Sequence, residues 1–148
     1  MKKFQFQLES VLNYRNQQLD ALLVELDMAQ ARVFAQEHKR DLAYERLSDY
    51  GAEFSARKAE GLSIQEALEF EACQQVLYQR ALHEQHLLDQ RRSELEVKRE
   101  EVIEKRKETH TLEHLKDTRR REYNAAAAKE DERALEDLTA TRRVLAAS

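Results

Sequence analysis

The sequence predicts an all-α protein: a long antiparallel coiled-coil hairpin of two helices with an overhanging C-terminal helix. Three observations lead to this fold class. Apolar residues recur at alternating steps of four and three along much of the chain, which is the pattern of a coiled-coil seam. The 148 residues include no proline and only two glycines, so long helices meet few interruptions. One strong turn signal near residue 60 separates two helical stretches.

The first helix is expected to run from about Phe4 to about Ala59. Eleven of its fourteen seam positions are apolar, and a stripe this narrow needs a partner helix to cover it. The positions are Leu8, Leu12, Arg15, Leu19, Leu22, Leu26, Ala29, Val33, Gln36, Arg40, Ala43, Leu47, Tyr50 and Phe54. Gly51 is a soft spot, because a glycine inside a helix costs about 1 kcal/mol relative to alanine.

The turn is expected at residues 60–63. Gly61 can adopt the left-handed conformation that closes a helix. Ser63 and Glu66 predict a capping box, in which the Ser63 hydroxyl meets the Glu66 amide and the Glu66 side chain returns to the Ser63 amide. The second helix is therefore expected from Ile64 to about Leu145, and residues 1–148 are expected to form a single domain.

The seam of the second helix is more polar than that of the first. Every second seam position from Glu84 to Lys105 is charged. The seam positions are Ala67, Phe70, Gln74, Leu77, Ala81, Glu84, Leu88, Arg91, Leu95, Lys98, Val102, Lys105, Thr109 and Leu112.

A short turn makes the two helices antiparallel. The predicted pairs are Phe54 with Ala67, Tyr50 with Phe70, Leu26 with Leu95 and Leu8 with Leu112. At about 1.5 Å per residue, the first helix is roughly 80 Å long and the second roughly 120 Å. The second helix therefore overshoots the first, and residues 116–145 are expected to form an unpaired single helix.

Composition excludes several classes of protein. The 25 basic and 29 acidic residues are interspersed and give a net charge of −4, whereas a nucleic-acid-binding protein would need a basic face. The N-terminus turns polar at once, and the sequence has no run of apolar residues long enough for an integral membrane segment. The single cysteine, Cys73, fits a reducing compartment and is expected to pack on the second helix. A soluble, cytoplasmic protein is expected.

One motif suggests metal chemistry. His110, Glu113 and His114 match the H-x-x-E-H arrangement of inverted zincins, and histidines four apart share a helix face. A hydrolase also needs a third ligand and a walled cleft, which a two-helix rod does not supply. The histidines are therefore expected to be ordinary flanking residues, and no metal, cofactor or enzymatic activity is expected.

Two clusters are candidate contacts for other proteins. Arg119, Arg120 and Arg121 form either a solvated helix face or a contact with an acidic protein surface. Aromatic residues gather near the turn, and Tyr44 and Tyr78 fall off the seam, so they either pack there or form an exposed docking patch.

The chain resembles the FliJ family, whose members are small coiled-coil components of the bacterial flagellar export apparatus. Residues 4–15, with the sequence FQFQLESVLNYR, are similar to the start of that family, and residues 112–123 are similar to its far end. The charged run into residues 136–138 also resembles the tail of the family. The alanines at 125–128 depart from it, because more charged residues are expected there.

The resemblance implies a non-enzymatic protein that inserts as a central stalk into the hexameric export ATPase ring and promotes its assembly and activity. It also implies contacts with the membrane export-gate protein and with export chaperones, at the cytoplasmic face of the inner membrane at the flagellar base. The tentative ring contacts are Leu8, Arg119, Arg120, Arg121 and Tyr123. The tentative gate contacts are Tyr44, Tyr50, Phe70 and Leu77.

Two other functions stay open from the residues. One is the equivalent stalk protein of a virulence-type type III secretion system, which genome context would distinguish. The other is a generic structural coiled coil that homodimerises, which an absence of ATPase stimulation would favour.

Overall fold

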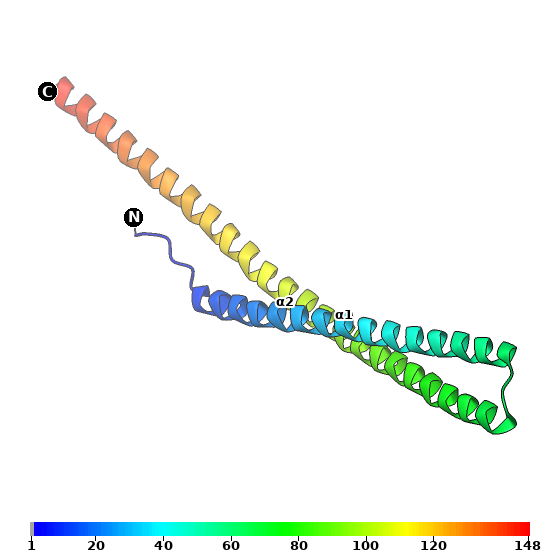
Figure 1. Cartoon of the computed structure of the whole chain (residues 1–148). Coiled ribbons are helices and arrows are strands. Elements are labelled where there is room, and N and C mark those ends of the chain that lie inside the picture. The colour runs from blue at the N-terminus through cyan, green and yellow to red at the C-terminus, as the bar shows by residue number, and fades with distance from the viewer. Residues whose placement is uncertain (1) are drawn as a thin grey trace. The chain divides into compact units, whose positions relative to one another are not determined.

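The computed structural model describes residues 2–148 and contains two helices. Helix α1 spans Glu9–Glu60 and helix α2 spans Ile64–Ala147 (Figure 1). The all-α fold class is confirmed, as no strand occurs within the described residues. Two compact units can be distinguished. We call Ala21–Ile103 the hairpin unit, and we call residues 2–20 together with residues 104–148 the terminal unit.

The turn forms where the sequence predicts it. Gly61 has a φ of 103°, and its N–H donates to the carbonyl oxygens of Arg57 at 3.1 Å and Lys58 at 3.2 Å, which closes α1. The Glu66 N–H donates to the Ser63 hydroxyl at 3.1 Å and starts α2. The returning bond from the Glu66 side chain, which a full capping box requires, is not formed in the structure of residues 2–148.

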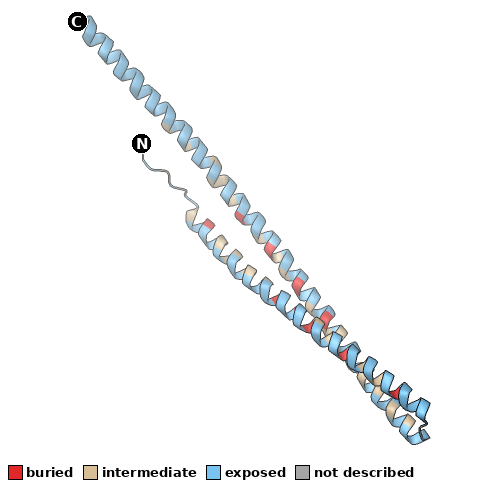
Figure 2. Ribbon diagram, turned by 45° about the horizontal axis from the view of Figure 1, so that its top comes forward, coloured by how far each residue is buried: buried red, intermediate tan, exposed pale blue. Residues whose placement is uncertain are grey.

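The core of the hairpin unit lies along the predicted seam. Ala29 and Val33 of α1 form a buried cluster with Leu88 and Leu95 of α2, and Leu26 packs against it. Figure 2 shows such buried residues as isolated red positions along otherwise exposed helices. Leu88 is 0% exposed, so the thin seam still excludes water completely at this point. Leu26 packs against the cluster that contains its predicted partner Leu95.

Aromatic rings close the hairpin unit near its turn. The ring centroids of Tyr50 and Phe70 are 5.4 Å apart, which confirms this predicted pair. Phe70 also stacks on Phe54, with centroids 5.1 Å apart, and the Lys58 ammonium lies 3.9 Å from the Phe54 centroid. These contacts fix the register beside the turn.

Polar seam positions in the hairpin unit find partners across the interface. Gln36 donates to the backbone carbonyl of Glu84 at 3.1 Å and also bonds to its carboxylate. Lys98 Nζ donates to Glu25 of α1 at 2.9 Å and to Glu101 of its own helix at 3.2 Å. These two hydrogen bonds raise the pKa of Lys98 above its ordinary value. Charged residues at seam positions therefore do not prevent the two helices from packing together.

The terminal unit is paired in the same way. Leu12 and Thr109 are buried, and the Thr109 hydroxyl donates to the carbonyl of Lys105 at 2.9 Å within its own helix. Lys105 donates to Glu108 at 3.1 Å, and Arg15 forms an ion pair with the same carboxylate. The hydrogen bond from Lys105, followed by the charge of Arg15, holds the pKa of Glu108 below its ordinary value.

Helix α1 begins at Glu9, so the predicted start at Phe4 is wrong. Residues 4–8 alternate apolar and polar, a period of two that suits an extended chain rather than a helix. Phe4 and Phe6 are half-buried, while Gln5 and Gln7 are exposed. A helix would turn the two phenylalanines to different sides, whereas the extended chain directs both to one side.

Replacement of the two glycines by alanine is expected to change the stability of the protein in opposite directions. A Cβ at Gly51 would lie 3.4 Å from Gln74 Nε2, an ordinary contact, so Gly51→Ala should stabilise the protein. We expect a gain of up to about 1 kcal/mol and a Tm about 2–4 °C higher. Gly61→Ala should lower the Tm, because the backbone there has a positive φ. Thermal unfolding followed by circular dichroism checks both, and a loss of stability in Gly51→Ala would contradict the helical packing described.

Candidate protein-binding site

The N-terminal residues 2–8 form an extended segment, which we call the strap, against α2 in the terminal unit. The ring centroids of Phe4 and Tyr123 are 5.6 Å apart, and the Tyr123 hydroxyl donates to the backbone carbonyl of Lys2. The Arg120 guanidinium lies 5.3 Å from the centroid of the Phe4 ring, a cation–π contact. The strap is therefore held by an aromatic pair, a cation and a hydrogen bond.

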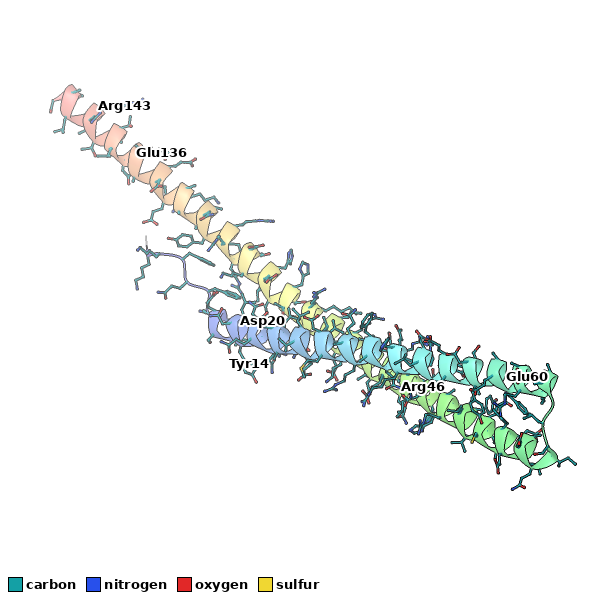
Figure 3. All side chains as sticks on the ribbon, in the orientation of Figure 1. Tyr14, Asp20, Arg46, Glu60, Glu136 and Arg143 are labelled. Carbon is teal, nitrogen blue, oxygen red and sulfur yellow. The ribbon has the colours of Figure 1, made fainter. Side chains whose placement is uncertain are left out.

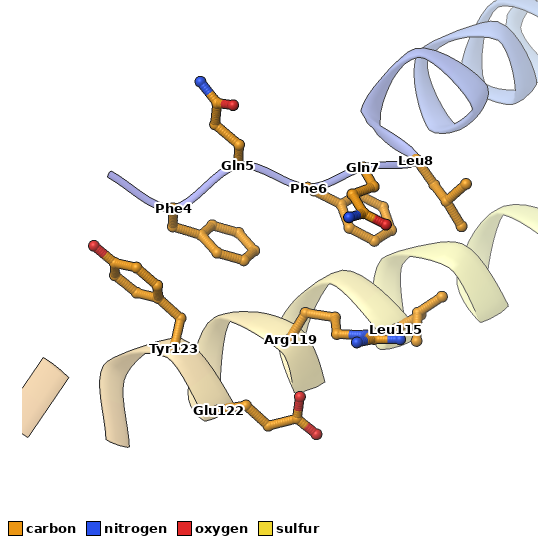
Figure 4. A pocket seen from close by; sticks show the side chains of 9 residues that line it. All are labelled: Phe4, Gln5, Phe6, Gln7, Leu8, Leu115, Arg119, Glu122 and Tyr123. Carbon is orange, nitrogen blue, oxygen red and sulfur yellow. The ribbon is translucent and has the colours of Figure 1, made fainter. Parts of the chain in front are cut away.

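A groove of about 390 Å³ lies between the strap and α2. In Figure 4, Phe4 and Phe6 point toward α2, whereas Gln5 points away from it. The lining residues are Phe4, Gln5, Phe6, Gln7, Leu8, Leu115, Arg119, Glu122 and Tyr123. The groove thus combines apolar rings with one guanidinium and one carboxylate.

Pairing in the terminal unit continues further along α2 than the sequence predicts. Lys116 Nζ lies 2.8 Å from a carboxylate oxygen of Glu9, and the strap reaches Tyr123. The expectation that α2 is unpaired from residue 116 is therefore wrong. An extended chain advances about 3.3 Å per residue against about 1.5 Å in a helix, so the short strap covers several turns of α2.

Beyond the strap, residues 124–147 of α2 form a single helix, which we call the overhang. Every residue of the overhang is exposed except Ala127, which is half-buried. Figure 2 shows its last turns as wholly exposed, and Figure 3 shows side chains such as Glu136 and Arg143 projecting from it into open space. Its exposed large apolar residues are Leu135, Leu138, Val144 and Leu145.

Some of the predicted ring contacts lie together in the groove, and another already packs against a residue of this chain. Leu8, Arg119 and Tyr123 meet in the groove beneath the strap. Arg120 contacts the Phe4 ring, and Arg121 is exposed. Sequence reasoning missed Phe4 and Phe6 as part of this surface, although their alternation with glutamine was a visible signal for an extended segment.

The predicted gate contacts do not form one exposed surface. Tyr50, Phe70 and Leu77 are half-buried in the packing of the hairpin unit, and only Tyr44 is exposed. Tyr78, the other aromatic residue off the seam, is exposed as well.

The residues considered for chemistry are all at the surface. His110, Glu113 and His114 are exposed, and no group of three metal-ligating side chains occurs in the part of the chain that the structure describes. Cys73 is exposed, so the expectation that it packs is wrong; it lies one position before the seam residue Gln74. Desolvation, together with the neighbouring Cys73 thiol, raises the pKa of Tyr50.

The apolar content of the helices is low. Among residues 2–148, neither helix has a stretch long and apolar enough to cross a membrane.

The chain matches the model of a known protein family. The family model described as "Flagellar FliJ protein" matches residues 4–146, which is nearly the whole chain. Searches of curated proteins and of solved structures found no significant match.

Proposed function

Since this chain belongs to the FliJ family and is a component of the flagellar export apparatus, we propose that it acts as a non-enzymatic stalk in that apparatus. In this proposal the overhang inserts into the ring of the hexameric export ATPase and promotes assembly and activity of the ring. The match to a flagellar family favours this function over the equivalent role in a virulence-type secretion system.

The overhang is the observation that carries the proposal. It is a continuous helix that contacts no other helix among the described residues, yet it bears four large exposed apolar residues. A single helix of this length is about 36 Å long and about 10–12 Å wide with its side chains, a shape that fits the axial channel of a ring. Covering apolar side chains that are left in water lowers the free energy, and this favours binding to a protein surface.

The strap gives the overhang a defined base. Phe4 and Tyr123 tie the N-terminal residues to α2 immediately before the overhang begins. Arg121 is exposed beside this base, and its guanidinium can pair with carboxylates at the mouth of the ring. We assign Leu8, Arg119, Arg120 and Tyr123 to the structure of the base itself, because each contacts or lines the strap.

A second partner would bind the hairpin unit. The export gate and export chaperones are partners that the family resemblance implies, at the cytoplasmic face of the membrane. Tyr44 and Tyr78 support such a contact, because both are exposed aromatic residues of the hairpin unit. Tyr50 and Phe70 would act indirectly, since their rings pack on each other.

The proposal predicts that this protein stimulates the matching export ATPase. ATP hydrolysis is measured with and without about one chain per hexamer, and the mixture is sized in parallel, because a ring that forms around a stalk should elute as a hexamer. Stimulation together with a ring-sized complex is the expected result. An ATPase whose rate and size are both unchanged would contradict the stalk function and favour a structural coiled coil.

A further inference from the structure

Helix α1 carries a second apolar stripe on its outer side, in addition to the seam that contacts α2. It recurs at steps of four and three, the spacing of a coiled-coil seam, within the hairpin unit. Its positions, apolar at all but His38, are Val24, Met28, Ala31, Ala35, His38 and Leu42, and we call them the outer stripe. All six are exposed, and at 3.6 residues per turn they face away from the core positions Ala29 and Val33.

The outer stripe is flanked by the most exposed aromatic residue of the hairpin unit. Phe34 is 75% exposed, and Val24 and Met28 are each more than half exposed. Apolar residues exposed in register along one helix face, on a protein that is otherwise rich in charge, indicate an interaction site. Because the spacing is that of a coiled coil, the surface fits another helix rather than a small molecule.

We propose that the outer stripe binds a second copy of this chain, as a parallel, in-register homodimer through α1. In this arrangement Met28, Ala35 and Leu42 each face the same residue of the second copy at the a positions of the heptad. At the d positions, Val24, Ala31 and His38 each face the same residue of the second copy. The small alanines at the centre of the stripe let the two helices approach closely.

The residues that flank the outer stripe decide in favour of a second copy. In parallel two-stranded coiled coils, each g position contacts the e position five residues later on the partner helix, and these contacts set partner choice and orientation. Three of the four such contacts beside the outer stripe are attractive: two ion pairs and one cation–π contact. They join Asp27 to Arg32, Phe34 to Lys39, and Asp41 to Arg46 of the second copy. The fourth brings Asp20 near Glu25, whose charge is already balanced by Lys98 at 2.9 Å.

The same flanks disfavour an antiparallel dimer. When the outer stripe is reversed on itself about its central alanines, Asp27 comes opposite Asp41, and Arg32 comes opposite Arg32 of the second copy. Like charges that face each other across the interface repel. In this arrangement only Glu25 and Lys39 form an attractive ionic contact. In the parallel dimer Asp41 remains able to accept a second donor, since its side chain is 66% exposed although it pairs with Arg40 at 2.9 Å.

The dimer is expected to be weak and reversible. The outer stripe spans six positions, so the interface is at the small end of specific protein contacts. Packing on α2 already holds α1 helical, so association does not have to order the helix. We therefore expect a Kd on the order of 10–100 µM.

Cysteine cross-linking tests the register on the full-length chain. In a Cys73→Ser background, Ala35→Cys should form a disulfide-linked dimer under mild oxidation, because paired a positions in a parallel coiled coil are within disulfide reach. Gln30→Cys, on an exposed face away from the outer stripe, is the matched control and should stay largely uncross-linked. A mixture of Ala31→Cys and Ala35→Cys chains that cross-links to each other more than either does to itself would overturn the parallel register.

Sedimentation equilibrium tests the surface and its charges. The wild-type mass should rise from one chain toward two with concentration, and Met28→Asp should abolish the rise while Val76→Asp, at an exposed site on α2, leaves it unchanged.

Asp27→Arg alone should weaken association at least several-fold, because Arg would face Arg32, and adding Arg32→Asp should restore it. Stronger association in Asp27→Arg would indicate the antiparallel dimer. A wild-type protein that stays monomeric up to about 1 mM would overturn the proposal.

Discussion

Val33→Asp should separate the two helices of the hairpin unit and sharply reduce the helical content of the protein. Val33 is 8% exposed and belongs to the buried cluster with Leu88 and Leu95. Its burial contributes about 2 kcal/mol, and an ionised carboxylate at the same place adds a desolvation cost of several kcal/mol. Together these exceed about 4 kcal/mol, a large share of the roughly 5–15 kcal/mol that stabilises a typical domain.

The effect should be large because the seam is thin. Each layer of a two-helix core holds few side chains, so no neighbouring residue can rearrange to shield the new carboxylate. Helices without a packed partner are marginal in water, so the loss of pairing should also appear as a loss of helix. Circular dichroism is expected to show a Tm at least about 10 °C lower than that of the wild-type protein.

Val97→Asp is the matched control for this variant. It makes the same substitution in the hairpin unit, but Val97 is 52% exposed and lies outside both the seam and the outer stripe. Its stability should stay within about 0.5 kcal/mol of the wild-type value. If the two variants melted alike, the effect would come from aspartate in a helix, and the assigned core position of Val33 would be wrong.

The seam could be predicted from sequence because, in a coiled coil, the burial of a residue follows from its spacing to neighbouring residues. Once the spacing of four and three is identified, each seam position follows from the one before it. Every predicted position from Leu12 to Leu112 is indeed buried or half-buried. The closing turn is equally local, since Gly61 and Ser63 act on backbone groups within a few residues.

The strap could not be predicted in the same way. Phe4 and Leu8 are four residues apart and therefore fit the seam, while Phe4 and Phe6 fit an extended chain, so the sequence carries both signals. The outcome depends on Tyr123 and Arg120, which pack on the Phe4 ring from the far part of the chain. Contacts between residues so distant in sequence leave no local period to detect.

The candidate sites show the same difference between features set by local spacing and features set by contacts distant in sequence. The sequence predicts Tyr123 as a contact residue but not its partner Phe4, because their contact is non-local. The family resemblance places Tyr50 and Phe70 among the gate contacts, yet their rings pack against each other. Sequence position alone does not tell an aromatic residue of a seam from one of a docking surface unless the residue lies clearly off the seam, as Tyr44 does.

Removal of the overhang should abolish ATPase stimulation and leave the rest of the chain folded. A chain ending at Asn124 retains Tyr123 and hence the contacts of the strap. The deleted residues are exposed except for half-buried Ala127, so their loss removes almost no packing from the terminal unit. Circular dichroism should show the helical signal reduced only in proportion to the deleted turns, with the Tm of the remainder unchanged.

A second truncation separates the overhang from its base. A chain ending at Lys116 lacks Arg119, Arg120 and Tyr123 as well, so the strap loses its aromatic and cationic partners. If the overhang provides stimulation, the two truncated proteins should be equally inactive toward the ATPase. Full stimulation by the chain ending at Asn124, together with its loss in the shorter chain, would instead assign the function to the strap and the arginines beside it.

A point variant tests whether stimulation depends on apolar residues of the overhang or only on the length of the overhang. Leu138→Asp keeps the chain complete and places a charge on an exposed helix surface, so it should leave the Tm unchanged. If apolar residues of the overhang are covered inside the ring, this carboxylate loses water on binding, and stimulation should fall by about tenfold or more. Wild-type stimulation would mean that Leu138 stays in water, and the inserted surface would then have to exclude this face of the helix.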